Sequence, residues 1–119
     1  MEIEGSGFTV KESKFDYFFG RVTSSPKNQQ RALNNLQNLR QLGIDESAGG
    51  RERLMQIFAQ GLTAQETTRK DTEYGTNIVR KVEVSGVEAT GAIEITYFYP
   101  GANLTAIPEV STLVVKIYK

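Results

Sequence analysis

The chain has 119 residues, contains neither cysteine nor histidine, and carries 14 basic and 14 acidic residues. Disulfides and zinc sites of the Cys/His type are therefore excluded, and no apolar run approaches the ~20 residues of a membrane-spanning helix. This length predicts a single domain, residues 1–119, for which we expect no metal and no cofactor. Between Lys11 and Lys81 the 12 basic residues exceed the 8 acidic ones, a weak indication of an anionic partner.

The N-terminal segment is acidic and has no apolar core of a signal peptide. The short stretch "GFTVK", residues 7–11, is expected to add a strand or to pack across a sheet edge. Four aromatic residues follow within residues 15–19. We expect them to fill the space between helix and sheet, and stacking on nucleic-acid bases is the alternative.

A first helix is predicted from Ser25 to Gly43. Ser25 suits the N-cap, Pro26 the first helical position and Gly43 the left-handed residue after the end. The apolar residues form one stripe with Leu36 near its centre: Ala32, Leu33, Leu36, Leu39 and Leu42. Polar residues spaced i, i+3, i+7 lie along the boundary of this stripe: Asn28, Arg31 and Asn35.

A second helix is predicted after "DESAGG", with Ser47 as N-cap and apolar residues from Leu54 to Leu62 at helical spacing. The following polar segment, residues 63–76, shows no apolar period and is expected to be a loop. Three alternating, β-branched segments then predict antiparallel strands: 77–86, 89–100 and 110–119. The predicted fold class is α+β, two N-terminal helices packed on an antiparallel sheet of three or more strands.

Basic and amide side chains gather around the start of the first predicted helix: Lys14, Arg21, Lys27, Asn28 and Arg31. A helix N-terminus presents free N–H groups and a positive dipole, so this cluster predicts a phosphate site, which Asn35 would extend. A hydrated helix start with ordinary ion pairs is the alternative.

Two strand residues are further candidates for substrate binding. Strict alternation places Arg80 on the face of Ile78 and Val82, where a guanidinium is costly unless it is paired. It would bind a phosphate or carboxylate, or else extend its head to solvent. Tyr97 offers a phenol near a strand end, and core packing is its alternative.

Three segments together resemble a known family: "SKFDYFFGRVTSSPKNQQRALNNLQNLRQLGI", "GRERLMQIF" and "NIVRKVEV". They are similar to the C-terminal effector modules of bacterial polymorphic and contact-dependent inhibition toxins, over most of residues 8–84. The family pattern has a histidine where this chain has Lys27 and a serine where it has Ala32. These two departures leave the activity of this chain open.

The resemblance implies a metal-independent ribonuclease, similar to the barnase–EndoU–colicin–RelE class. In that chemistry the 2′-hydroxyl attacks its own phosphodiester; Lys14 or Lys27 would handle the proton, and Arg21 and Arg31 would stabilise the phosphorane. It further implies RNA and a cognate immunity protein as partners, and delivery from a secreted parent protein into the target-cell cytoplasm. The rival hypothesis is a cytoplasmic, non-catalytic interaction or immunity-type module.

Overall fold

The computed structural model describes residues 2–20, 25–86 and 89–118. Within these residues the chain forms one six-stranded sheet, three α-helices and one 3-10 helix, η1 (Glu46–Ala48). The strands are β1 (Glu2–Glu4), β2 (Thr9–Lys11), β3 (Gln65–Thr72), β4 (Gly75–Ser85), β5 (Thr90–Pro100) and β6 (Glu109–Ile117). The helices are α1 (Ser13–Phe18), α2 (Pro26–Gln41) and α3 (Gly50–Gly61).

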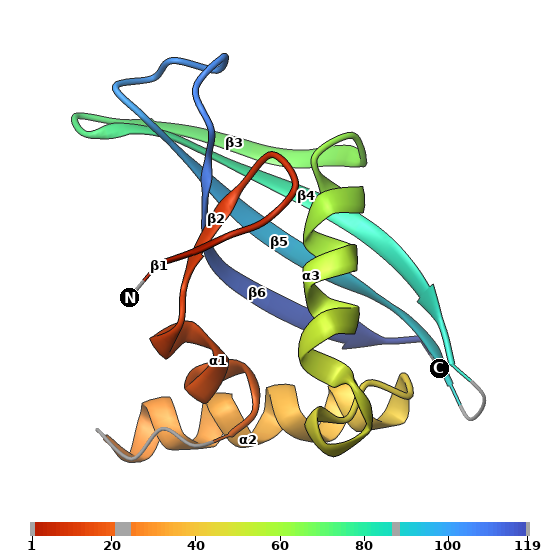
Figure 1. The fold of residues 1–119 in the computed structure, drawn as a ribbon. Coiled ribbons are helices and arrows are strands. Elements are labelled where there is room, and N and C mark those ends of the chain that lie inside the picture. Colours follow the sequence, from red (N-terminus) through yellow and green to blue (C-terminus); the bar gives the residue numbers. More distant parts are fainter. Residues whose placement is uncertain (1, 21–24, 87–88, 119) are drawn as a thin grey trace.

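The sheet is curled and mixed, with strand order β1-β2-β6-β5-β4-β3. Its six strands form five neighbouring pairs within the described residues. Four pairs are antiparallel, and one, β2 with β6, is parallel and joins only Thr9–Val10 to Glu109–Val110. Beyond Val110, β6 has no strand on its outer side among the described residues. Figure 1 shows α3 lying across one face of the sheet, and α2 lying crosswise at its lower end.

The two longer helices begin and end for identifiable reasons. The Ser25 hydroxyl oxygen accepts the Asn28 N–H at 3.2 Å, and Pro26 takes the first position of α2, both as predicted. Gly43 follows the end of α2 with φ of 80°, the left-handed conformation expected there. Ser47 does not cap α3, because α3 begins at Gly50 and its N-cap is Gly49. Ser47 lies in η1, where Asp45 accepts its N–H and hydroxyl.

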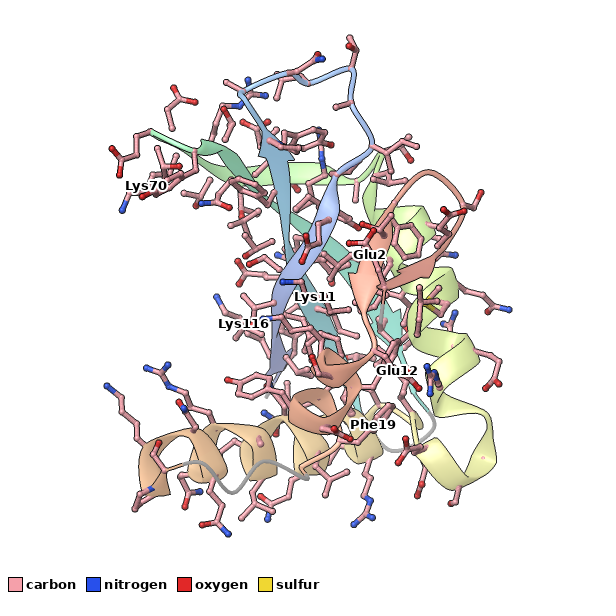
Figure 2. All side chains as sticks on the ribbon, turned by 60° about the vertical axis from the view of Figure 1, so that its left-hand side comes forward. Glu2, Lys11, Glu12, Phe19, Lys70 and Lys116 are labelled. Atoms are coloured by element: carbon pink, nitrogen blue, oxygen red, sulfur yellow. The ribbon has the colours of Figure 1, made fainter. Side chains whose placement is uncertain are left out.

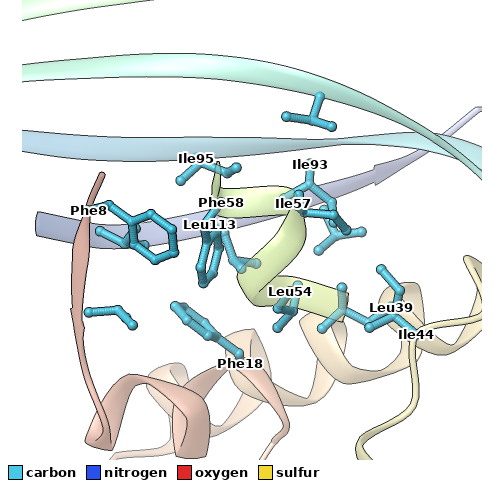
Figure 3. Packing of buried hydrophobic residues seen from close by; sticks show 14 of the residues in the cluster. Phe8, Phe18, Leu39, Ile44, Leu54, Ile57, Phe58, Ile93, Ile95 and Leu113 are labelled. Carbon is cyan, nitrogen blue, oxygen red and sulfur yellow. The ribbon is translucent and has the colours of Figure 1, made fainter. Parts of the chain in front are cut away.

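The core lies between the sheet and the helices (Figure 3). Helix α3 contributes Leu54, Ile57 and Phe58, and the facing strands contribute alternate residues such as Ile93 and Ile95, all with no exposed surface. The aromatic residues that were expected to fill the space between helix and sheet belong to this core, and Phe15, Phe18 and Phe19 are all buried. Packing, rather than base stacking, therefore explains these three rings.

The predicted fold class is wrong. The sheet has six strands and is mixed, two strands precede the first helix, and it curls into a half-barrel instead of forming a small layer under two N-terminal helices. The segment predicted to be a polar loop forms β3, whose eight residues are all exposed and pair with β4. An edge strand with both faces in solvent needs no apolar alternation, so periodicity could not reveal it.

The individual elements were predicted more accurately than their assembly. Helices α2 and α3 and strands β4, β5 and β6 lie where the periodicity placed them, and β2 lies within "GFTVK". The apolar stripe of α2, however, is centred on Leu39, which is fully buried, whereas Leu36 is half-buried and Leu33 is 37% exposed. The N-terminal half of α2 therefore extends away from the core, as Figure 2 also shows.

Candidate functional site

A cleft of about 560 Å³ separates α2 from β6. Its helical wall carries Arg31, Asn34, Asn35 and Asn38, and its opposite wall is the stretch of β6 from Thr112 to Val115, with Tyr17 of α1 beside them. This volume lies within the usual range of ligand sites in proteins. The surface of the cleft is largely apolar, and the amides and one guanidinium on α2 add hydrogen-bonding groups and a positive charge to it. The site can therefore hold a ligand that has both an apolar and an anionic part.

The polar row on α2 is a direct consequence of helical spacing. Asn28, Arg31 and Asn35 were predicted to share one face, and the unbroken helix continues this face one turn further to Asn38. Arg31 is exposed, whereas Asn35 is only 8% exposed. The row therefore runs from solvent at the helix start to the protein interior beside β6.

The free edge of β6 is covered in part by a side chain instead of a strand. The Asn38 amide donates to the Val115 carbonyl oxygen at 3.2 Å, which shows that this carbonyl faces α2. Alternate residues of a strand direct their backbone groups to the same edge, so the backbone of Leu113 faces the same side. Main-chain donors and acceptors thus line the cleft together with the side-chain amides.

The remaining predicted residues near the helix start are placed as follows. Lys27 is exposed on α2, one turn before Arg31, and Asn28 is exposed next to it, its backbone N–H bound to Ser25. Lys14 is half-buried on α1. None of these three is among the residues that line the cleft. Arg21 lies outside the described residues.

Arg80 and Tyr97 lie elsewhere, on the sheet face that packs against α3. The Tyr97 hydroxyl is buried and donates to the Phe58 carbonyl oxygen at 2.6 Å, and burial raises the pKa of this phenol well above its ordinary value. Arg80 Nη1 donates to the Ala64 carbonyl oxygen at 2.8 Å, and its Nε is buried without a partner among the described residues. Both side chains bind the C-terminal end of α3 to the sheet.

Charged side chains also occupy the opposite, uncovered face of the sheet. Lys116 pairs with Glu94, and Figure 2 shows Lys116 on the side toward which α2 extends. The Tyr118 hydroxyl donates to Glu83 at 2.7 Å, and this bond holds the pKa of Glu83 below its ordinary value. The hydrogen bond with Tyr118 and the charge of Glu83 raise the pKa of Lys81. These groups are mutually paired and form a charged surface beside the cleft.

Sequence reasoning missed three polar members of the cleft: Tyr17, Asn34 and Asn38. Asn38 could have been found, because it extends the spacing of Asn28, Arg31 and Asn35 by three residues. Tyr17 was grouped with the three neighbouring phenylalanines, yet it is half-buried and faces the cleft. No sequence signal distinguishes its orientation from theirs.

Two further observations concern the described residues alone. They contain no group of three or more Asp, Glu, His or Cys side chains arranged to hold a metal ion. None of their helices combines the length and the apolar character needed to cross a membrane.

Comparison with known proteins adds a structural relative. No family model matches the chain, and no curated protein matches it in sequence. The fold has a counterpart among solved structures. It is similar to that of a chain in the contact-dependent growth inhibition toxin–immunity protein complex from Klebsiella pneumoniae 342, with a TM-score of 0.74, 21% identity, and coverage of 90% of this chain and 98% of that chain. At this identity the likeness establishes a shared fold.

Proposed function

We propose that this chain is the effector module of a contact-dependent inhibition toxin and cleaves RNA without a metal ion. The observation that carries the proposal is the α2–β6 cleft, where the predicted residues Arg31 and Asn35 meet a free strand edge. The family resemblance of the sequence and the fold of the Klebsiella complex support the same toxin system. On this proposal a cognate immunity protein is a partner, and the module acts in the target-cell cytoplasm.

The groups of the cleft suit a phosphodiester substrate. Arg31 presents a planar set of N–H donors that matches two phosphate oxygens and favours the additional negative charge of a phosphorane. Lys27, one turn earlier on α2, adds a second cation on the exposed part of the same helix. The attacking nucleophile is the 2′-hydroxyl of the substrate, so the protein needs to supply only proton transfer and charge stabilisation. The proposed proton-transfer groups, Lys14 and Lys27, do not line the cleft, so the substrate would extend beyond the cleft to reach them.

The test is the chemistry of the product. The purified chain, incubated with an RNA oligonucleotide in EDTA, should give fragments ending in a 2′,3′-cyclic phosphate. An oligonucleotide with 2′-deoxyribose at the cleaved position should remain intact, because it lacks the nucleophile. Cleavage of the deoxy-substituted oligonucleotide, or activity that requires an added divalent cation, would contradict the proposed mechanism.

A non-catalytic interaction or immunity-type module is the second candidate, and a specific observation favours it. This chain has Lys27 and Ala32 where the resembling family has histidine and serine, and Ala32 is fully buried, so a hydroxyl there would be enclosed. Expression in the bacterial cytoplasm separates the two candidates. The effector should arrest growth unless its immunity protein is present, whereas an interaction module should be expressed without harm.

A further inference from the structure

A second groove lies beside the β1–β2 hairpin, apart from the α2–β6 cleft. Its volume of about 340 Å³ is within the range of ligand sites in proteins, and it shares no lining residue with the cleft. The lining residues come from the hairpin, the end of β5, the segment between β5 and β6, and the first residue of β6. The side chains that decide the chemistry of this hairpin groove are Glu2, Glu4, Phe98, Ile107 and Glu109.

Strand pairing aligns four lining residues in one row across the sheet. Glu4 of β1 pairs with Thr9 of β2, and Thr9 pairs with Glu109 of β6. Glu109 in turn pairs with Phe98 of β5. Residues that pair across neighbouring strands point to the same face of a sheet, whereas Val110, the next residue of β6, points the other way and is buried in the core. The row therefore lies on the uncovered face of the sheet.

The charged groups that line the hairpin groove are all negative. They are the carboxylates of Glu2, Glu4 and Glu109. Glu109 Oε1 lies 3.9 Å from Lys11 Nζ, but no ion pair joins Glu2 or Glu4 to any residue in the described part of the chain. Unpaired carboxylates around an apolar floor favour a cation on whatever molecule enters the groove.

Exposed apolar side chains gather at the same end of the sheet. Ile107 lines the groove and is 64% exposed, and Leu104 in the same loop is 45% exposed. Tyr74 in the β3–β4 turn is 74% exposed, and its carbonyl oxygen accepts the Gly101 N–H at 3.0 Å, which joins the turn to this loop. Figure 1 shows the turn and the loop at the end of the sheet away from α2. Exposed apolar groups bordered by polar ones mark protein interaction sites.

We infer that the hairpin groove binds a segment of a partner protein in which arginine or lysine stands beside an aliphatic residue. The aliphatic side chain would contact Phe98 and Ile107, and the cation would pair with the free carboxylate of Glu4. The inference goes beyond the proposed catalytic function and does not depend on it, because the groove and the cleft are separate. An effector and an interaction module would both present this surface to a protein.

A second copy of this chain is the alternative occupant. The part of α2 that extends from the core carries Lys27 and Arg31 on its exposed surface, so it is cationic as well. That contact would be head-to-tail, and each added copy would still have an empty groove, so open chains of copies would form unless the rotation closed a ring. A different protein fills the groove without this consequence.

The test uses a synthetic peptide, acetyl-Leu-Arg-Leu-Arg-Leu-amide, titrated into the intact chain and followed by NMR. One control peptide has glutamate in place of arginine, and another has serine in place of leucine. We expect the probe to shift the backbone amide signals of Glu4, Phe98 and Ile107. It should bind at least about fivefold more tightly than either control, because one lacks the cation and the other the apolar contact. Added salt should weaken the binding.

Three variants at exposed positions locate the bound peptide. Glu4→Gln should weaken binding by roughly two- to fivefold, the range expected for an exposed ion pair. Ile107→Ser should weaken it by at least about fivefold through the lost apolar contact. Glu52→Gln removes an exposed carboxylate from α3, outside the groove, and should bind the peptide like the wild type.

Several results would overturn the inference. They are the absence of shifts at the groove, equal binding of the glutamate peptide, and equal effects of Glu4→Gln and Glu52→Gln. Concentration-dependent self-association of the wild type that Glu4→Gln abolishes would assign the groove to a second copy and so also overturn it. Specific binding of the probe by a chain that does not cleave RNA would uphold the inference and refute the ribonuclease proposal alone.

Discussion

Replacing Tyr97 by phenylalanine should destabilise the protein and leave the α2–β6 cleft intact. The change removes the 2.6 Å hydrogen bond to the Phe58 carbonyl oxygen and leaves that acceptor inside the core, at a site where Tyr97 has no exposed surface. An unsatisfied buried acceptor costs about 1–3 kcal/mol. With an unfolding entropy of about 2.1 cal/mol/K per residue, each kcal/mol lowers the melting temperature by roughly 4 °C, so a decrease of about 4–12 °C is expected.

The pH dependence of stability tests the same hydrogen bond. Burial raises the pKa of Tyr97 in the folded chain, whereas the phenol of the unfolded chain loses its proton near pH 10. Above that pH the unfolded state binds fewer protons than the folded state, so the free energy of unfolding falls, by up to about 1.4 kcal/mol per pH unit. The contribution is fully present below pH 10, and Tyr97→Phe should show a shallower alkaline loss.

Urea denaturation at pH 7 and at several values above pH 10 measures both effects, with Tyr74→Phe, at a tyrosine that is 74% exposed, as the matched control. A change below about 0.5 kcal/mol at pH 7 would show that the Phe58 carbonyl finds another partner. Equal alkaline slopes for the wild type and Tyr97→Phe would show that the phenol is not held protonated by the fold. Loss of RNA cleavage with unchanged stability would instead return Tyr97 to the substrate-binding role predicted from the sequence.

Three further predictions concern packing and surface charge. Leu39→Ala, at a fully buried position, should cost about 2–5 kcal/mol in urea denaturation, and Leu36→Ala, at a half-buried one, clearly less; the reverse order would contradict the packing of α2. Gly61→Ala should destabilise the chain by about 1–3 kcal/mol, because its new methyl group would collide with the Tyr97 hydroxyl, and a neutral effect would show that this contact relaxes. Lys116→Ala breaks an ion pair between an exposed lysine and the partly buried Glu94, and it should change the free energy of unfolding by less than about 1 kcal/mol; a larger loss would mean that the pair organises the open sheet face.

The sequence predicts the elements whose burial imposes a period. Helix α2 and strands β4 to β6 each bury one side, so their apolar residues recur at helical or alternating spacing. Strand β3 buries neither face and α1 has only six residues, so neither leaves a periodic pattern. The parallel pairing of β2 with β6 involves two residue pairs between segments about a hundred residues apart, which no local pattern encodes.

The same distinction between local pattern and tertiary packing applies to the residues of the candidate site. Helical spacing alone brings Arg31 and Asn35 to one surface, so their proximity could be predicted. The grouping of Arg80 and Tyr97 with them assumed that these strand residues face a ligand. Tertiary packing decides which face of the sheet α3 covers. It covers the face that carries Arg80 and Tyr97, whose polar groups donate to the Ala64 and Phe58 carbonyl oxygens. Strand alternation assigns residues to a face without telling which face is open.

The rate of RNA cleavage by Arg31→Ala is the most direct test of the central claim, that the α2–β6 cleft is the catalytic site. Arg31 lines the cleft and is exposed, so its removal should lower the rate at least about tenfold, equivalent to ~1.4 kcal/mol of transition-state stabilisation, with an unchanged melting temperature. Arg53→Ala removes another exposed guanidinium, from α3 and outside the cleft, and this variant should cleave RNA at the wild-type rate. Equal rates for the wild type and both variants would contradict the account.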